Sequence, residues 1–207
     1  MRNLKIAMAG PSGTGKTTLA EWIANEFKLP FITSSTKPLW EKHNIQSHKE
    51  LITRTMLNPQ WGLDFQYEVL EFRQNIINNY ESFVTDRSPI DNLVYFLMQN
   101  TPYLGEEATE AYISLCAEAL SKMDGLIQIP FGDHIPLEND GKRINNRFYQ
   151  LSTNSQFAIA SNLISDKLPP KGPLRVVTLP MWDWEERKTA VAKFIDIGLL
   201  GDNEELE

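Results

Sequence analysis

The segment with the clearest chemistry is a glycine-rich stretch near the N-terminus that ends in lysine and threonine. It reads GPSGTGKT and fits the pattern G-x-x-x-x-G-K-[ST] without a mismatch. Glycines in this pattern let backbone N–H groups turn inward around phosphate oxygens, the lysine reaches the β- and γ-phosphates, and the hydroxyl after it ligates Mg²⁺. The residues predicted to hold a nucleoside triphosphate are Gly10, Ser12, Gly13, Thr14, Gly15, Lys16, Thr17 and Thr18.

The flanking sequence places this stretch between a strand and a helix. The apolar run LKIAMAG precedes it at residues 4–10, and KTTLAEWIANEF follows at residues 16–27 with helical character. A helix that begins at the lysine adds the positive end of its dipole to the phosphate site. Phosphate binding alone leaves three fates for the γ-phosphate: transfer to water, transfer to an acceptor hydroxyl, or retention as a conformational switch.

A second set of reactive side chains follows another apolar run. The segment SFVTDRSPID, residues 82–91, reads as a strand, then Asp86 and Arg87, then a helix start. A carboxylate at the end of a strand beside the phosphate site holds the Mg²⁺ water shell or accepts the proton of an acceptor hydroxyl. Arg87 pairs with Asp86 or with a phosphate, and Asp91 favours the dipole of the helix's first turn. The candidate catalytic residues are Lys16, Asp86 and Arg87, and the candidate Mg²⁺ ligands are Thr17 and Asp86.

Polar residues after a third apolar run suit an acceptor molecule. Residues 33–37 read TSSTK, and Ser35 and Lys37 of this loop suit a polar or phosphorylated acceptor. The same residues fit an ordinary helix start followed by a solvated lysine equally well. Arg73 reaches an acceptor phosphate or makes a surface salt bridge. Aromatic side chains of this region serve base stacking or the core, and they are Trp40, Trp61, Phe65, Tyr67 and Phe72.

The segment after the fourth apolar run is polar and basic. Residues 130–157 contain an Asn-Asp-Gly turn signal, followed by Lys142, Arg143 and Arg147. The two arginines are spaced i, i+4 at the start of a predicted helix, so both can face one phosphate cluster. A solvated basic face is the alternative interpretation of the same residues.

Strands alternate with helices along the chain. Apolar runs typical of buried parallel strands lie at residues 4–10, 30–35, 82–88, 125–131 and 174–180. Amphipathic helices are predicted at residues 16–27, 47–57, 64–80, 89–100, 105–123, 145–166 and 183–197. The patterns SHKE and DWEE cap two of them. This alternation predicts one α/β domain over residues 1–207, with ligands at the C-terminal ends of the strands and a frayed acidic tail at 202–207.

The composition of the chain argues against several classes of protein. A net charge of −7 argues against a grip on long nucleic acid by bulk electrostatics, although a local basic groove is compatible with it. No apolar run is long enough to cross a membrane, and the N-terminus lacks a signal-peptide pattern. The single cysteine, Cys116, reads as a small buried hydrophobe in a reducing interior. We expect a cytoplasmic protein of a bacterium or phage-infected host with no membrane partner. The sequence leaves open whether the protein forms a homodimer.

The phosphate loop together with TDRSPIDNLVYFLM resembles the nucleoside- and nucleotide-kinase branch of P-loop NTPases. It is also similar to the phage and bacterial AAA-type group that includes ribosylnicotinamide kinase domains. The resemblance implies a P-loop NTPase fold with a five-stranded, mainly parallel sheet in the kinase-like order 2-3-1-4-5, sandwiched by helices, and a lid at about residues 132–150. It also implies ATP and Mg²⁺ as cofactors and assigns Arg143 and Arg147 to phosphoryl transfer as lid arginines.

Deoxynucleoside kinases carry a comparable acid-Arg-Ser at this strand end and a Phe-Gln pair on the preceding helix, where the Gln addresses a nucleobase. Phe65 and Gln66 in LDFQYEVLEFRQ fit that pattern. These kinases also place a catalytic Glu just after the second strand, whereas FITSSTKPLWEKH has no acid before Glu41. The base role therefore falls to Asp86 or to Asp64 on the next helix. The candidate substrate residues are Ser35, Lys37, Asp64, Phe65, Gln66 and Arg73.

Three functions stay open at this point. The first is transfer of the ATP γ-phosphate to a hydroxyl of a nucleoside, a nucleotide or a similar small acceptor. The second is similar to phage kinases that phosphorylate 5-hydroxymethyluracil in DNA, and it needs a flipped base and a basic track for the DNA backbone. The third is an NTP-driven switch or ATPase module, although the guanine-specificity pattern N-K-x-D is absent from the chain. The candidates for the basic track are Lys37, Arg54, Arg73, Arg143 and Arg147.

Overall fold

The computed structural model describes residues 3–33, 35–132, 146–169, 172–181 and 183–201. Within them, one parallel sheet contains the strands β1 (Lys5–Ala9), β2 (Phe31–Ile32), β3 (Phe83–Thr85), β4 (Gly125–Gln128) and β5 (Arg175–Thr178). The strand order is β2-β3-β1-β4-β5. This confirms the predicted α/β fold, its parallel sheet and its strand order.

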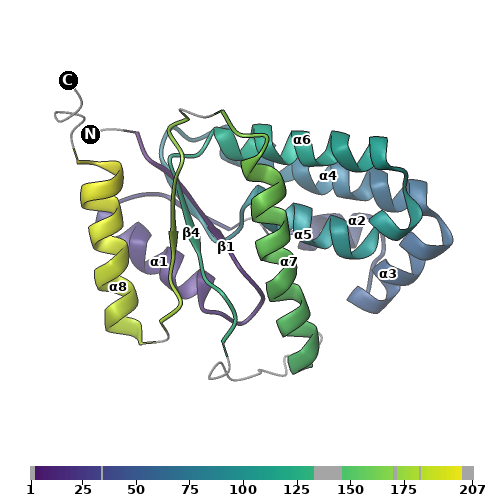
Figure 1. The fold of residues 1–207 in the computed structure, drawn as a ribbon, viewed down its shortest axis with the longest axis horizontal. Helices are drawn as coiled ribbons and strands as arrows, with labels where there is room; N and C mark the ends of the chain where they lie inside the picture. The colour runs from purple at the N-terminus through teal and green to yellow at the C-terminus, as the bar shows by residue number, and fades with distance from the viewer. Residues whose placement is uncertain (1–2, 34, 133–145, 170–171, 182, 202–207) are drawn as a thin grey trace.

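Helices cover both faces of the sheet (Figure 1). The helices α1 and α8 lie against one face, and α7 lies against the other together with α5 and α6. Helices α2 and α3 lie on the side of the molecule opposite α8 in the same view. The bounds are α1 (Lys16–Phe27), α2 (Lys37–Lys42), α3 (His48–Leu57), α4 (Pro59–Ile77), α5 (Pro89–Gln99), the 3₁₀ helix η1 (Thr101–Tyr103), α6 (Glu106–Ser121), α7 (Arg147–Ser165), α8 (Trp184–Lys193) and the π-helix η2 (Phe194–Leu199).

The side chains of β1 alternate between the two helical layers. Ile6 and Met8 pack toward α1 and α8, while Ala7 and Ala9 pack toward α5, α6 and α7. All four are fully buried, as expected for the centre of a parallel sheet covered on both faces. Small alanines on one side let helices approach the sheet closely at the end where the phosphate loop begins.

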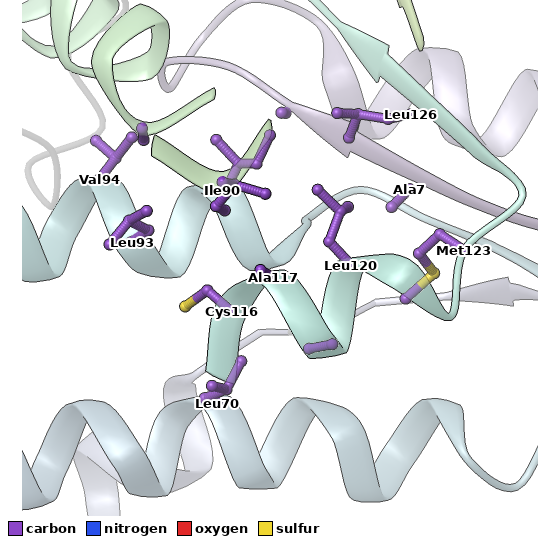
Figure 2. Packing of buried hydrophobic residues seen from close by; sticks show 14 of the residues in the cluster. Ala7, Leu70, Ile90, Leu93, Val94, Cys116, Ala117, Leu120, Met123 and Leu126 are labelled. Atoms are coloured by element: carbon purple, nitrogen blue, oxygen red, sulfur yellow. The ribbon is translucent and has the colours of Figure 1, made fainter. Parts of the chain in front are cut away.

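The helical layer on the side of Ala7 and Ala9 is built mainly from apolar side chains of α4, α5 and α6. Figure 2 shows Leu70, Ile90, Ala117 and Leu120 with Cys116 among them. Burial raises the pKa of the Cys116 thiol, so the thiol stays protonated at neutral pH. The prediction that this cysteine is a small buried hydrophobe is confirmed.

Helix starts follow local capping chemistry. The Ser47 side chain accepts a hydrogen bond from the Glu50 backbone, and Asp183 accepts from the backbones of Glu185 and Glu186, as the capping patterns predict. Helix α4 begins at Pro59 and not at residue 64, which corrects the predicted boundary. The reason is an unrecognised cap, because the Asn58 side chain accepts from the Trp61 backbone and proline suits the first helical turn.

Among the described residues, no helix combines the length and the apolar character that crossing a membrane requires.

The first prediction concerns the layer in Figure 2. Leu120 is 1% exposed, so Leu120→Ala should lower the free energy of unfolding by about 3 kcal/mol, through lost burial and the cavity left behind. Leu57 is 82% exposed, so Leu57→Ala should change it by less than about 0.5 kcal/mol. Urea unfolding of both variants measures the difference. Equal destabilisation by the two substitutions would contradict the packing described.

Candidate active site

The phosphate loop turns sharply at its three glycines. Gly10, Gly13 and Gly15 have φ angles of 146°, 80° and 85°, a region that side chains other than glycine rarely adopt. At Gly10 a Cβ atom would also lie 2.2 Å from the carbonyl oxygen of Ile129, so the residue that follows β4 leaves no space for a side chain there. These two constraints explain why the loop needs glycine where β1 ends and where α1 begins.

Lys16 lies folded against the loop that it follows. Its Nζ atom donates to the carbonyl oxygens of Gly10 and Pro11, each at 2.6 Å, and the residue is only 5% exposed. The Thr14 hydroxyl donates to the same Pro11 carbonyl at 3.0 Å. The ammonium group is therefore held within the concave turn that the glycines form, where phosphate oxygens would find it.

Thr17 and Asp86 are in direct contact, although Thr17 lies in the first turn of α1 and Asp86 follows β3. The Thr17 hydroxyl donates to the Asp86 carboxylate at 2.7 Å across a sequence separation of 69 residues. They meet because β1 and β3 are parallel neighbours, with Ala7 opposite Thr85. A hydroxyl and a carboxylate are hard oxygen donors of the kind Mg²⁺ takes beside substrate phosphates, so this pair suits the predicted metal role. No cluster of three or more His, Cys, Asp or Glu side chains suited to a metal occurs in the described part of the chain.

Arg87 is held by Asp91 on the first turn of α5. The two form an ion pair at 3.0 Å, and Asp91 is fully buried. Burial disfavours the charged guanidinium, but the carboxylate outweighs it and the pKa of Arg87 is raised. Asp91 also accepts from the backbone and the hydroxyl of Ser88, which completes a capping box. Asp91 thus fixes both the helix start and the arginine, beyond the dipole role predicted for it.

A cavity opens beside the phosphate loop and encloses about 170 Å³, enough for one aromatic ring. Ser12 of the loop lies in its wall, so the phosphate site and the cavity adjoin. Four predicted residues, Phe65, Gln66, Arg73 and Arg87, also line it. The remaining lining residues are Thr36, Trp40, His48, Leu51, Val69, Asn92, Tyr95 and Gln99.

The wall of the cavity combines aromatic rings with buried amides and cations. Phe65 is 3% exposed and stacks on Trp61 at 5.5 Å between ring centroids. Gln66 is 4% exposed and its amide lies 3.5 Å from that of Gln99. The Arg73 guanidinium donates to Asn92, and its pKa is lowered by burial and by the neighbouring Arg87 charge.

His48 stays uncharged at neutral pH in this wall. Burial, followed by the nearby Arg87 charge, lowers its pKa, and the ring lies against Trp40 and Tyr95. Among the described residues, no hydrogen-bond partner lies within reach of the buried Nδ1 atom of His48, so a polar ligand in the cavity could supply one.

Three predicted substrate residues do not reach the cavity wall. Asp64 is exposed and accepts from Gln60 at 2.8 Å, because it lies about 200° around α4 from Gln66. Lys37 is exposed and faces Glu41 at 3.8 Å. The Ser35 hydroxyl accepts from the Lys37 backbone at 3.3 Å and so serves the start of α2. Ser35 and Lys37 therefore make the local contacts of a helix start with a solvated lysine. Thr36 is the residue of this loop that lines the cavity.

The predicted lid falls largely outside the described residues. Arg143 is among the residues not described, and Arg147 is the first residue of α7. The Arg147 guanidinium lies 5.9 Å from the centre of the Phe131 ring, just after β4. The Asn146 side chain accepts from the Tyr149 backbone and caps α7, so this arginine projects from a defined helix start.

Several cavity residues were not predicted from the sequence. Asn92, Tyr95 and Gln99 come from α5 and share one face at i, i+3 and i+7. Polar side chains at this spacing on a helix that is otherwise buried and apolar are a signal that the sequence does carry. Two further polar residues of the wall, His48 and Thr36, carry no comparable pattern.

Comparisons with known proteins agree with the fold of the chain. A model of the ATPase family associated with various cellular activities (AAA) matches residues 6–59, which include the phosphate loop. No curated protein sequence is significantly similar to the chain. The structure of NadR protein in complex with NR is 19% identical with a TM-score of 0.57, and the match covers 100% of this chain and 53% of that one. The chain thus spans about half the length of NadR.

Two further solved structures match over nearly their whole length. Thymidylate kinase from Candida albicans is 16% identical with a TM-score of 0.50, covering 97% of this chain and 94% of that one. Shikimate kinase from Acinetobacter baumannii in complex with shikimate is 14% identical with a TM-score of 0.50, covering 99% and 97%. The chain has a P-loop NTPase fold of the kinase-like type. Its P-loop is the segment from Gly10 to Thr17 that joins β1 to α1.

The second prediction concerns the buried pair beside the P-loop. Asp91→Asn should lower the free energy of unfolding by about 2 kcal/mol, because it removes the fully buried charge partner of a partly buried arginine. Asp64→Asn is the control, since Asp64 is exposed, and it should change stability by less than about 0.5 kcal/mol. Chemical unfolding measures both. An Asp91 variant as stable as the control would show that the pair does not support the fold.

Proposed function

We propose that the chain is an ATP-dependent phosphotransferase that moves the γ-phosphate to a hydroxyl of a nucleoside- or nucleotide-type acceptor. The observation that carries this proposal is the position of Ser12, a P-loop residue in the wall of a cavity that Gln66 and Arg87 also line. A triphosphate on the loop and an acceptor in the cavity would therefore be neighbours. Positioning of this kind supplies most of the catalysis in phosphoryl transfer.

The donor half of the site consists of the P-loop and Asp86. The backbone of the loop would cradle the phosphates, and Lys16 would leave the Gly10 and Pro11 carbonyls for phosphate oxygens. Thr17 and Asp86 would hold Mg²⁺, which neutralises charge on the β- and γ-phosphates. Arg147 would add positive charge from the lid, and Arg143, which lies outside the described residues, is assigned the same role. The structure of NadR protein in complex with NAD and AMP-PNP, with a TM-score of 0.54, supports ATP as the donor.

The acceptor half is suited to a planar polar molecule. Phe65 and Trp40 offer apolar walls, while Gln66, Gln99 and His48 offer uncharged hydrogen-bonding groups, a combination that fits a heterocyclic base. The cations Arg73 and Arg87 face the same cavity and would attract an acceptor hydroxyl or phosphate. Thymidylate kinase, one of the structures with this fold, is named for a nucleotide substrate, and another, NadR, is in complex with NR.

Asp86 is the remaining candidate for the acceptor's proton. Asp64 points away from the cavity, and Asp91 is engaged by Arg87 and Ser88. A phosphoryl acceptor needs only weak assistance from a base, because bond formation to the incoming oxygen is little advanced in a loose transition state. A carboxylate shared between Thr17 and Mg²⁺ therefore suffices for orientation of the hydroxyl.

The two alternative functions, a kinase that acts on DNA and an ATPase or switch, have less support from the described residues. A DNA acceptor needs a basic track, yet Arg54 donates to the His43 carbonyl and pairs with Glu50, and Arg73 lies inside the cavity. Of the described candidates for this track, Arg54 and Arg73 are therefore engaged elsewhere. An ATPase or switch is favoured only by the AAA family match at residues 6–59.

The third prediction concerns the donor. Lys16→Ala should reduce phosphoryl transfer by about a thousandfold, since it removes the positive charge nearest the transferring group. Lys49→Ala, which alters an exposed lysine on α3, is the control and should retain activity. Turnover with ATP and Mg²⁺ measures both, with circular dichroism confirming the fold. Full turnover by the Lys16 variant would refute the assignment of the P-loop as the donor site.

The fourth prediction concerns the acceptor. Mass spectrometry of reactions with ATP should show the gain of one phosphate on a member of a panel of nucleosides, nucleotides, ribosylnicotinamide and DNA containing 5-hydroxymethyluracil. Gln66→Leu should lower kcat/KM for that acceptor by about tenfold or more while leaving the KM for ATP unchanged, because it removes a buried hydrogen-bonding amide from the cavity. Gln60→Leu on the exposed side of α4 is the matched control. Phosphate on the DNA alone would favour the polynucleotide kinase, and ADP without any phosphorylated acceptor would favour the ATPase.

A further inference from the structure

The P-loop is braced from outside by an arginine near the C-terminal end of the described chain. Arg187 on α8 donates through Nη1 to the carbonyl oxygen of Thr14 at 2.7 Å, across a sequence separation of 173 residues. Its Nε atom donates to the carbonyl oxygen of Met181, also at 2.7 Å. Arg187 is 3% exposed and Thr14 is fully buried, so this is an interior contact. The guanidinium spans the gap between the loop and the segment that precedes α8.

The contact fixes one peptide plane of the loop. The Thr14 carbonyl and the Gly15 N–H belong to a single trans peptide, so they point in opposite directions. A bond from Arg187 to the carbonyl therefore turns the Gly15 N–H away from α8. Gly15 stands at φ 85°, where its lack of a side chain leaves this plane free to rotate in the absence of a brace. A Cβ atom on Gly15 would lie 3.2 Å from Nη1, so the guanidinium packs directly against this residue.

Arg187 is mounted on a rigid element. The Asp183 side chain caps α8 by accepting from the backbones of Glu185 and Glu186, each at 2.9 Å. One turn after Arg187, Val191 is fully buried in the cluster that α8 shares with α1. Burial lowers the pKa of Arg187, but a guanidinium starts from so high a value that it stays charged at neutral pH. The brace is therefore a fixed positive charge behind the loop.

We propose that Arg187 is a positioning residue for the donor, which orients the Gly15 N–H toward the phosphates and adds a positive charge behind the P-loop. The role deepens the proposed function but rests only on phosphate binding by the loop. It acts through the Thr14–Gly15 peptide and involves no contact between Arg187 and the acceptor. Its loss should weaken the binding of any polyphosphate, whether or not a base is attached.

The experiment compares three variants by calorimetric titration with ATP and with inorganic tripolyphosphate. Arg187→Met removes both donors at similar length and should weaken both ligands by about tenfold or more and by a similar factor. Arg187→Lys keeps the charge but cannot span both carbonyls, so its affinity should fall in between. Arg175→Met, at an exposed arginine on β5, is the control and should bind as the wild type does.

Thermal unfolding is followed in parallel, and titrations are made below each transition. Variants that melt earlier but bind both ligands with wild-type affinity would overturn the proposal, because a merely structural arginine predicts that result. If Arg187→Met does not fold, the same comparison of melting temperature with affinity for both ligands is made on Arg187→Lys. Polyphosphate binding by the wild type without transfer to any acceptor would refute the proposed function alone, and absence of binding would refute both.

Discussion

The site depends on one short hydrogen bond between segments that are distant in sequence. Thr17 at the start of α1 donates to Asp86 at the end of β3, at 2.7 Å. This contact requires β1 and β3 to be parallel neighbours in a defined register, with Ile6 opposite Val84. A shift of one residue would turn every side chain of the strand to the other helical layer, so the packing of both layers enforces the register. The apolar core thereby fixes the distance between the phosphate loop and its acid.

The same arrangement explains why a cavity adjoins the loop. Helix α5 begins directly after β3, so Arg87 and the face of α5 that bears Asn92 and Gln99 lie close to the strand ends. Helix α4 supplies Gln66 from the other side. Buried polar groups cost free energy unless they are paired or serve a ligand, and here they gather at one wall. At this wall, polar side chains therefore replace apolar ones in the interior, at the place where a polar acceptor would bind.

The sequence predicted those parts of the site that are contiguous or periodic. The P-loop was recognisable because its eight residues carry their own geometry, and the strand order followed from the resemblance. Asp64 and Lys37 lie outside the cavity wall, with local partners in Gln60 and Glu41, because the position of the cavity depends on how α2, α4 and α5 pack together. Arg187 could not be predicted, since its contact with Thr14 depends on how α8 docks against the sheet, which no local pattern encodes.

We infer that the P-loop and the adjoining cavity are two halves of one phosphoryl-transfer site. The decisive measurement is a crystal structure of the chain with AMP-PNP and Mg²⁺. We expect the β- and γ-phosphates within the loop, Mg²⁺ beside Thr17 and Asp86, and the γ-phosphate facing the cavity lined by Arg87 and Gln66. A triphosphate bound elsewhere, or a γ-phosphate directed away from this cavity, would show that the loop and the cavity do not form one site.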